Sequence, residues 1–309
     1  MIEFDNIGYS TKSSIEREKM NILQIGVPKG SLQQSTVSLF KKAGYTISIS
    51  DRSYYPQIND EEIGTMLLRP QEMALYVEKG VIDIGLAGRD WVRECNADVV
   101  EIAEFIYSRS TNRPARWVLA VAEGSNIQSV QDLEGKIIFT ELVESTKKYL
   151  VKNKVNAEVK FSHGATEVKI PHLCQAIVEL TETGNSLRAN QLRIIDTVME
   201  SVTIMVANRD SWQNEWKKNK IENIKMLLAG ALKAEGKVGL KMNIESKHLD
   251  KLIAILPSMR NPTISSLSQD SWCAVETIID QRICRDLIPK LRRIGAEGII
   301  EYSLNKVIP

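Results

Sequence analysis

The chain contains few residues of the kinds that form cross-links or bind transition metals. Its 309 residues include four cysteines and three histidines. The cysteines form no C-x-x-C pair and the histidines have no metal-ligand spacing. This argues against a disulfide framework and against a zinc site made by the protein. We expect four free thiols and no metal held by protein side chains alone.

Long apolar runs and an excess of one charge are also missing. No apolar stretch approaches the roughly 20 residues that a membrane span needs. Residues 1–20 contain no apolar core of signal-peptide length. The formal net charge is +1, with 43% hydrophobic and 26% charged residues. This balance argues against a membrane protein, a disordered chain and a nucleic-acid-binding protein. We expect a cytoplasmic protein in which residues 1–20 form an N-terminal extension.

What the sequence does contain is an alternation of strand and helix patterns, which predicts an α/β fold. The first unit begins with a strand over 21–27, a helix over 31–42 and a strand over 46–50. A second α/β unit begins near a strand over 117–122. Later segments, including a strand over 201–207, lead the chain back to the first unit. Two lobes with a cleft between them are therefore expected.

The last part of the chain has a different order of elements. After Gly236 the pattern predicts four strands and two helices, namely strand 238–244, helix 246–256, strand 263–267, strand 272–279, helix 281–294 and strand 298–302. This order is typical of the split βαβ module of ferredoxin type. Such modules often bind small regulatory ligands, which is an analogy at the level of the fold.

One segment, residues 176–190, combines features of a phosphate-binding loop. An apolar strand end is followed by Glu179 and Glu182 and by a hydroxyl-rich loop with a single Gly184. Backbone N–H groups at the start of the following helix lack internal partners and attract anions. The carboxylates just upstream can hold the two hydroxyls of a ribose. The segment therefore suits ribose 5-phosphate.

An ordinary turn accounts for the same residues. Thr-Glu-Thr-Gly between a strand and a helix is common, and Ser186 would then serve as the helix N-cap. The residue types alone leave both interpretations open.

Several further stretches carry a resemblance to a known family. In order and at family-like spacing, the chain from about residue 21 to 309 is similar to the long form of ATP phosphoribosyltransferase, the first enzyme of histidine biosynthesis. Besides the loop, the matching stretches are Val27-Pro28-Lys29-Gly30-Ser31-Leu32, Leu68-Arg69-Pro70-Gln71-Glu72-Met73, Gly85-Leu86-Ala87-Gly88-Arg89-Asp90-Trp91, Arg116-Trp117-Val118-Leu119-Ala120-Val121, Gly164-Ala165-Thr166-Glu167-Val168-Lys169, Gly236-Lys237-Val238-Gly239-Leu240-Lys241-Met242-Asn243 and Glu301-Tyr302-Ser303-Leu304-Asn305-Lys306-Val307-Ile308-Pro309.

The resemblance implies a fold and its division into domains. The catalytic core would be two-lobed, like a periplasmic binding protein. Lobe I would span 21–113 with a return segment at about 199–225, and lobe II would span 114–198 and carry the phosphoribosyl loop. Residues 226–309 would form a ferredoxin-like (ACT-like) βαββαβ regulatory domain that senses histidine.

The resemblance also implies a reaction. The phosphoribosyl group of phosphoribosyl pyrophosphate would pass to N1 of ATP, and pyrophosphate would leave. Mg²⁺ would be bound through the pyrophosphate of the substrate. No covalent enzyme nucleophile is needed, so catalysis would come from positioning and from stabilising the charge on the leaving group. Histidine would inhibit the enzyme, which would be a hexamer in exchange with a dimer.

The family's catalytic residues map onto a defined set here. Cations for the phosphates would be Lys29, Arg52 and Arg69, and Glu141 would face the cleft from lobe II. Substrate would be bound by Asp90, Glu179, Thr181, Glu182, Thr183, Gly184, Asn185, Ser186 and Leu187. Simpler roles stay open: the cations could form surface ion pairs, Asp90 could be a helix N-cap, and Glu179 could be a solvated strand-end carboxylate.

The family's histidine contacts fall on Asn243, Met259, Asn261, Thr263 and Gly298. Asn243 stands where some members carry Asp, whose carboxylate would pair with the amino group of the ligand, so weaker binding is expected. The alternative is that Asn243 simply ends a strand.

Some positions depart from the family pattern. Gln175 replaces a usual Asp, Ala87 replaces a usual Thr, and Phe139 replaces a small residue. If these positions surround the cleft, the chain could instead be a weakened or acceptor-altered paralogue, either a nucleotide-binding protein or another purine phosphoribosyltransferase. Two lobes around a cleft also describe solute-binding proteins.

Overall fold

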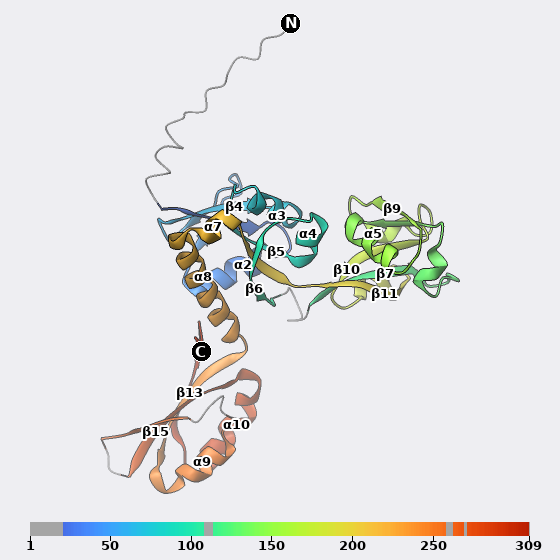
Figure 1. Cartoon of the computed structure of the whole chain (residues 1–309). Coiled ribbons are helices and arrows are strands. Elements are labelled where there is room, and N and C mark those ends of the chain that lie inside the picture. The colour runs from blue at the N-terminus through green and yellow to red at the C-terminus, as the bar shows by residue number, and fades with distance from the viewer. Residues whose placement is uncertain (1–20, 108–113, 258–261, 269–270, 309) are drawn as a thin grey trace. The chain divides into compact units, whose positions relative to one another are not determined.

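The computed structural model describes residues 21–107, 114–257, 262–268 and 271–308. The chain forms two compact units, Met1–Lys41 with Tyr45–Lys225 and Lys42–Gly44 with Met226–Pro309. The larger unit contains two lobes, each built on a five-stranded sheet (Figure 1). The smaller unit contains a four-stranded sheet.

The first lobe is a mixed sheet with strand order β4-β1-β5-β12-β6. Its parallel part consists of β1 (Leu23–Pro28), β4 (Ile63–Leu68) and β5 (Ile84–Gly88). The returning strand β12 (Thr203–Ala207) pairs antiparallel with β5 and with β6 (Val100–Phe105). The helices of this lobe are α2 (Gln33–Ala43), α3 (Pro70–Glu78) and α4 (Arg89–Glu94), and β2 (Ile47–Ser48) and β3 (Gln57–Ile58) form a small separate ribbon.

The second lobe has strand order β11-β7-β10-β8-β9. These strands are β11 (Leu192–Ser201), β7 (Ala115–Ala122), β10 (Ala176–Thr181), β8 (Ile137–Thr140) and β9 (Glu158–Phe161). Its helical segments are η1 (Val130–Leu133), α5 (Val143–Lys152), η2 (Thr166–Lys169) and α6 (Asn185–Ala189). In Figure 1 the long strand β11 leads from this lobe to β12 of the first lobe. The expected crossing back to the first lobe is therefore present.

A buried carboxylate anchors the return segment to the first lobe. Asp83 is 5% exposed, and its Oδ1 accepts hydrogen bonds of 2.6 Å from the Ser211 hydroxyl and from Lys217 Nζ. Its Oδ2 accepts the Gln24 N–H at 2.7 Å. Ser211 lies on α7 (Arg209–Gln213) and Lys217 on α8 (Glu215–Lys233). Because both carboxylate oxygens accept hydrogen bonds and Lys217 supplies an opposite charge, the cost of burying this carboxylate is offset.

The smaller unit has the ferredoxin-type order that the sequence predicts. The sheet runs β14-β15-β13-β16 with all neighbours antiparallel. The elements are β13 (Lys237–Glu245), η3 (Ser246–His248), α9 (Leu249–Ile255), β14 (Thr263–Ser266), β15 (Trp272–Asp280), α10 (Gln281–Arg293) and β16 (Glu297–Ser303). Alternate residues of β13, among them Leu240 and Met242, are fully buried against the core. The expected fold class is thus confirmed.

Among the described residues, no helix combines the length and the apolar character needed to cross a membrane.

Candidate active site

A cavity of about 290 Å³ in the larger unit brings several of the predicted site residues together. Its walls come from the starts of α2 and α3, from α4, and from strand ends of both lobes. The predicted residues that line it are Asp90, Glu141, Glu179 and Glu182. They come from three separate segments of the sequence, so the cavity is a product of the fold.

Asp90 is a buried carboxylate with one unused oxygen. The side chain is 3% exposed. Its Oδ2 accepts the Trp117 Nε1–H at 2.6 Å, whereas Oδ1 has no partner among the described atoms. A Cβ at Gly88 would lie 2.0 Å from Oδ1, so the glycine leaves room for the carboxylate. Helix α4 begins at Arg89 with Gly88 at its N-cap, so the N-cap alternative for Asp90 is wrong. An unpaired buried acceptor in a cavity suits a ligand donor.

Glu179 is a carboxyl of this cavity with a shifted pKa. Burial raises the pKa of this carboxyl above its ordinary value, and the nearby Glu167 and Glu141 carboxylates add to the rise. Hydrogen bonds from the Thr166 side chain and from the Leu180 N–H (3.0 Å) oppose it. The strand-end alternative of a solvated carboxylate does not fit this half-buried position. A carboxyl with a raised pKa that lies among other carboxylates marks this cavity as a candidate active site.

The predicted phosphate loop has a defined backbone geometry. Gly184 adopts a left-handed conformation (φ 76°) and forms the N-cap of α6. Its N–H donates to Thr181 Oγ1 at 2.8 Å. Ser186 lies within α6, and its hydroxyl donates to Glu167 Oε1 at 2.6 Å. The N-cap alternative for Ser186 is therefore wrong, because the cap position belongs to a glycine.

A cation that the sequence did not single out lies at this loop. The Arg188 guanidinium donates to the Thr183 carbonyl oxygen at 3.1 Å and to the Asn185 side chain. It therefore fixes two residues of the predicted phosphate loop and places a positive charge beside them. In the sequence, the signal for Arg188 is its position one turn after the loop. Ordinary surface residues of a helix occupy the same kind of position.

The three predicted phosphate cations occupy different places. Lys29 and Arg69 line a second cavity of about 430 Å³, where Lys29 Nζ lies 4.2 Å from the ring centroid of Tyr54. Arg52 is exposed in the turn after β2 and lines none of the cavities described here. The two cavities border the same two turns, since Ser31 and Gln71 line the first. None of the three cations forms an ion pair within the described part of the chain.

The unusual residues line neither of the two cavities that hold predicted site residues. The Gln175 side-chain oxygen accepts the Ile137 N–H at 3.1 Å, at the start of β10 and therefore at the opposite end of the strand from the loop. Phe139 packs on the core of lobe II and Ala87 on the core of lobe I. Phe139 and Ala87 therefore contribute to the packing of the two sheets. That these positions surround the cleft stays a prediction.

The predicted histidine residues lie in the smaller unit. Asn243 is half-buried within β13, opposite Ala274 and Glu297, so it does not end the strand. Gly298 has φ 57°, and a Cβ there would lie 3.6 Å from Asn243 Nδ2, so the two positions are adjacent. Thr263 is exposed on β14. Met259 and Asn261 lie outside the described residues.

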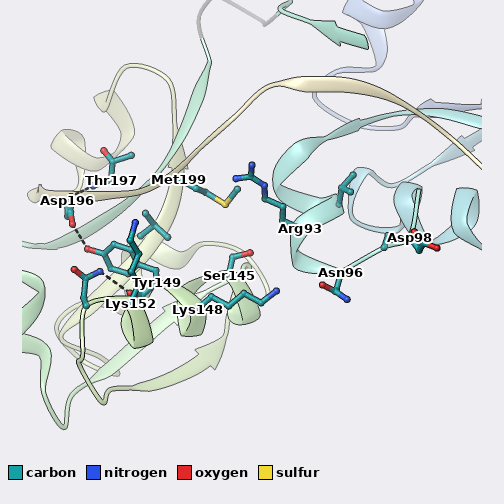
Figure 2. A pocket seen from close by; sticks show the side chains of 14 residues that line it. Arg93, Asn96, Asp98, Ser145, Lys148, Tyr149, Lys152, Asp196, Thr197 and Met199 are labelled. Atoms are coloured by element: carbon teal, nitrogen blue, oxygen red, sulfur yellow. Dashed lines mark hydrogen bonds between the residues drawn. The ribbon is translucent and has the colours of Figure 1, made fainter. Parts of the chain in front are cut away.

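A larger cavity, about 950 Å³, lies between α4, α5 and β11 (Figure 2). It is lined by Arg93, Lys148 and Lys152, and the Tyr149 hydroxyl there donates to Asp196. None of the predicted site residues lines it. Across the described chain, no group of three or more His, Cys, Asp or Glu side chains is placed to hold a metal ion.

Comparisons with known proteins identify the family. The model described as ATP phosphoribosyltransferase matches residues 69–230, and that of the HisG C-terminal domain matches residues 234–306. An ATP phosphoribosyltransferase of Chlorobaculum parvum is 58% identical over 288 residues, covering 93% of this chain and 98% of the relative. One of Thermodesulfovibrio yellowstonii is 56% identical over 291 residues, covering 94% and 100%.

Solved structures agree with this assignment. The chain is similar to the ATP phosphoribosyl transferase (HisG:HisZ) complex from Thermotoga maritima, with a TM-score of 0.58 and 26% identity over 67% of this chain and 99% of that chain. With relatives this similar along nearly the whole sequence, the chain belongs to the ATP phosphoribosyltransferase family, glycosyltransferases of histidine biosynthesis.

Proposed function

We propose that the chain transfers the phosphoribosyl group of phosphoribosyl pyrophosphate to N1 of ATP and releases pyrophosphate. The observation that carries the proposal is the cavity in which Asp90, Glu141 and Glu179 come together. It borders the turns that also carry Lys29 and Arg69. Acids for sugar hydroxyls and cations for phosphates are what this reaction needs side by side.

The proposed roles follow from the chemistry of displacement at an anomeric carbon. Positive charge develops on the ribose while negative charge develops on the leaving pyrophosphate. The loop Thr181–Leu187 holds the 5-phosphate through its N–H groups, and Glu179 accepts hydrogen bonds from ribose hydroxyls. Lys29 and Arg69 stabilise the pyrophosphate as charge builds on it. The unpaired oxygen of Asp90 accepts a hydrogen bond from a substrate donor.

Mg²⁺ is the proposed cofactor. It usually binds through one or two carboxylates together with substrate phosphates. The residues present fit this mode, since Glu141 and Glu182 line the cavity and no cluster of three acids is placed to hold a metal within the described residues. When bound, the ion would neutralise charge on the pyrophosphate.

Regulation and assembly complete the proposal. Histidine inhibits the enzyme by binding at Asn243, Met259, Asn261, Thr263 and Gly298. The protein is a homo-oligomer, a hexamer in exchange with a dimer, and works in the cytoplasm. The adjacency of Asn243 and Gly298 on neighbouring strands supports one ligand contacting both.

The test is an absorbance assay of phosphoribosyl-ATP formation by the purified full chain with ATP, phosphoribosyl pyrophosphate and Mg²⁺. We expect turnover that needs all three and falls when histidine is added. Matched reactions contain another purine nucleotide in place of ATP. Turnover with that acceptor and none with ATP would replace this proposal by the acceptor-altered paralogue. Binding without turnover of any acceptor would favour a nucleotide-binding protein.

A further inference from the structure

Helix α5 begins without a cap from its own sequence. Its N-cap position is Leu142, which provides no side-chain hydrogen bond. The first N–H groups of a helix have no partner within the helix and need an acceptor from elsewhere. This start matters because Glu141, which lines the cavity, is the residue just before Leu142. Whatever fixes the first turn of α5 also fixes the backbone that carries Glu141.

The acceptor comes from the other lobe. Glu94, the last residue of α4, receives the Glu144 N–H on Oε1 and the Ser145 N–H on Oε2, both at 2.8 Å. Each carboxylate oxygen thus holds one N–H of the first turn of α5. A negative charge at a helix N-terminus also interacts favourably with the helix dipole. Glu94 itself lines none of the cavities described here.

The contacts around Glu94 form a closed ring that includes two cavity residues. Cys95, the next residue, directs its thiol to the Gln71 carbonyl oxygen at 3.6 Å. The Gln71 side chain donates to Glu141 Oε2 at 3.5 Å. From Glu141 the chain continues through Leu142, whose N–H donates to Thr140 Oγ1 at 3.0 Å, into the turn that Glu94 caps. These contacts therefore keep the Gln71 and Glu141 side chains next to each other.

Other residues of α4 reinforce this attachment to lobe II. Trp91 packs on the core of lobe II and makes an edge contact with Trp117, with ring centroids 6.3 Å apart. Asp90 accepts the Trp117 N–H. Although α4 follows β5 of the first lobe, three of its six residues bind the second. Loss of Glu94 alone would therefore disturb the start of α5 without detaching the helix.

We propose that Glu94 is a positioning residue of the transfer reaction: by capping α5 from the other lobe, it holds the Glu141 carboxylate in the cavity against Gln71. This inference rests on the proposed function. Glu94 lines none of the described cavities, so its effect on the reaction passes through Glu141.

The experiment measures kcat, KM for both substrates and amide hydrogen exchange at Glu144 and Ser145. Since small displacements of a catalytic group can cost up to about a hundredfold in rate, we expect Glu94→Ala to lower kcat about tenfold or more, with KM changed less than about threefold. Glu94→Gln, which retains an acceptor oxygen, is expected to lose less. Exchange at both amides should accelerate in Glu94→Ala.

A matched control is Glu78→Ala. Glu78 also ends a helix, α3, and its Oε1 accepts the Asp98 N–H at 3.1 Å, but both residues lie in the first lobe. This variant loses a comparable bond from glutamate to backbone without involving Glu141. We expect its kcat to stay within about twofold of wild type, whatever its effect on stability, because neither Glu78 nor Asp98 lines the candidate active-site cavity.

A double-mutant cycle separates positioning from general damage. In a Glu141→Gln background, Glu94→Ala should cost little further kcat, because residues that act as a unit are not additive. An equal loss in both backgrounds, or a Glu94→Ala enzyme with normal kcat, would overturn the inference while leaving the proposed function intact. An inactive wild type would overturn the proposed function itself, and with it this role of Glu94.

Discussion

At the scale of single residues, the energetics of Glu179 oppose its proposed use. Burial raises the pKa of the carboxyl above its ordinary value of 4.5, so the ionised form is disfavoured in the free protein. The ionised form is nevertheless the one that accepts two hydrogen bonds from ribose hydroxyls. At functional sites, the protonation state needed for function is frequently not the one that the local environment favours.

Proton linkage decides how the raised pKa of Glu179 changes stability with pH. Between 4.5 and the raised pKa, the native state binds more protons than the unfolded state, so stability falls as pH rises through this window. Glu179→Gln should therefore be more stable than wild type at pH 7, with the difference vanishing below about pH 4. Thermal unfolding at both values checks this. Equal stability at pH 7 would contradict the raised pKa.

The same substitution should change the pH profile of the reaction. We expect wild-type kcat/KM to rise with pH along an acidic limb that lies above the range of an ordinary glutamate. Glu179→Gln should lose this limb and lower kcat/KM for phosphoribosyl pyrophosphate about tenfold or more, since hydrogen bonds to a charged group are lost. A variant that keeps the wild-type limb would assign it to another group.

The predicted cations can be ranked by their positions. Lys29 and Arg69 line one cavity, whereas Arg52 is exposed outside it. We expect Lys29→Ala and Arg69→Ala each to lower kcat at least about tenfold, because one charge stabiliser commonly contributes several kcal/mol. The loss in Arg52→Ala should be smaller. Steady-state kinetics at saturating substrate test the order, and normal kcat in both cavity variants would remove them from the site.

At the scale of elements, the sequence predicts what local patterns encode. Helix α3 begins with Pro70 and is followed, after Lys79, by Gly80 at φ 68°, two signals that the sequence itself contains. The strand expected over 117–122 is β7, whose inner residues are all buried. Proline at a helix start, glycine after its end and a continuous apolar run each act locally, so these elements can be predicted without tertiary information.

The missed elements depend on long-range pairing. Strand β6 contains two glutamates and mostly half-exposed positions, and its partner β12 is about a hundred residues away. Strand β4 pairs with β1 across α2. The interlobe contacts of Asp90 and Glu94 have no sequence signal of their own, because a carboxylate that caps a distant helix looks like any surface acid. Family resemblance could therefore suggest candidate site residues, whereas their arrangement in space could not be predicted from the sequence.

The phosphate loop yields a prediction at the same scale. Gly184→Val should abolish binding of phosphoribosyl pyrophosphate, because a β-branched side chain is strained at φ 76° and its Cβ would lie 3.2 Å from Arg188 Nη1. The strain costs roughly 1–2 kcal/mol of stability. Calorimetry measures the binding. Gly184→Asn is the control for the backbone, since asparagine tolerates this conformation, and unchanged binding by the valine variant would exclude the loop.

At the scale of the whole molecule, catalysis and regulation are assigned to different compact units. The proposed reaction uses residues of the larger unit alone, and the proposed histidine site uses residues of the smaller one. The division falls at Lys225, inside α8, a single helix with fully buried residues on both sides of it: Ile221, Ile224, Leu228 and Ala231. A ligand bound to the smaller unit can affect the reaction if it prefers one conformation or assembly over another.

This separation predicts that a chain ending at Lys225 loses histidine inhibition and keeps substrate binding. The shortened α8 loses the buried Leu228 and Ala231, so the test includes a full-length variant that keeps every element. Thr263 is exposed on β14, and Thr263→Val removes one hydroxyl that histidine would bind, so about a tenfold rise in the inhibitory concentration is expected for a bond of roughly 1.4 kcal/mol. In the absence of histidine, the turnover of Thr263→Val should equal that of wild type. Inhibition of the shortened chain at the wild-type concentration would move the histidine site into the larger unit.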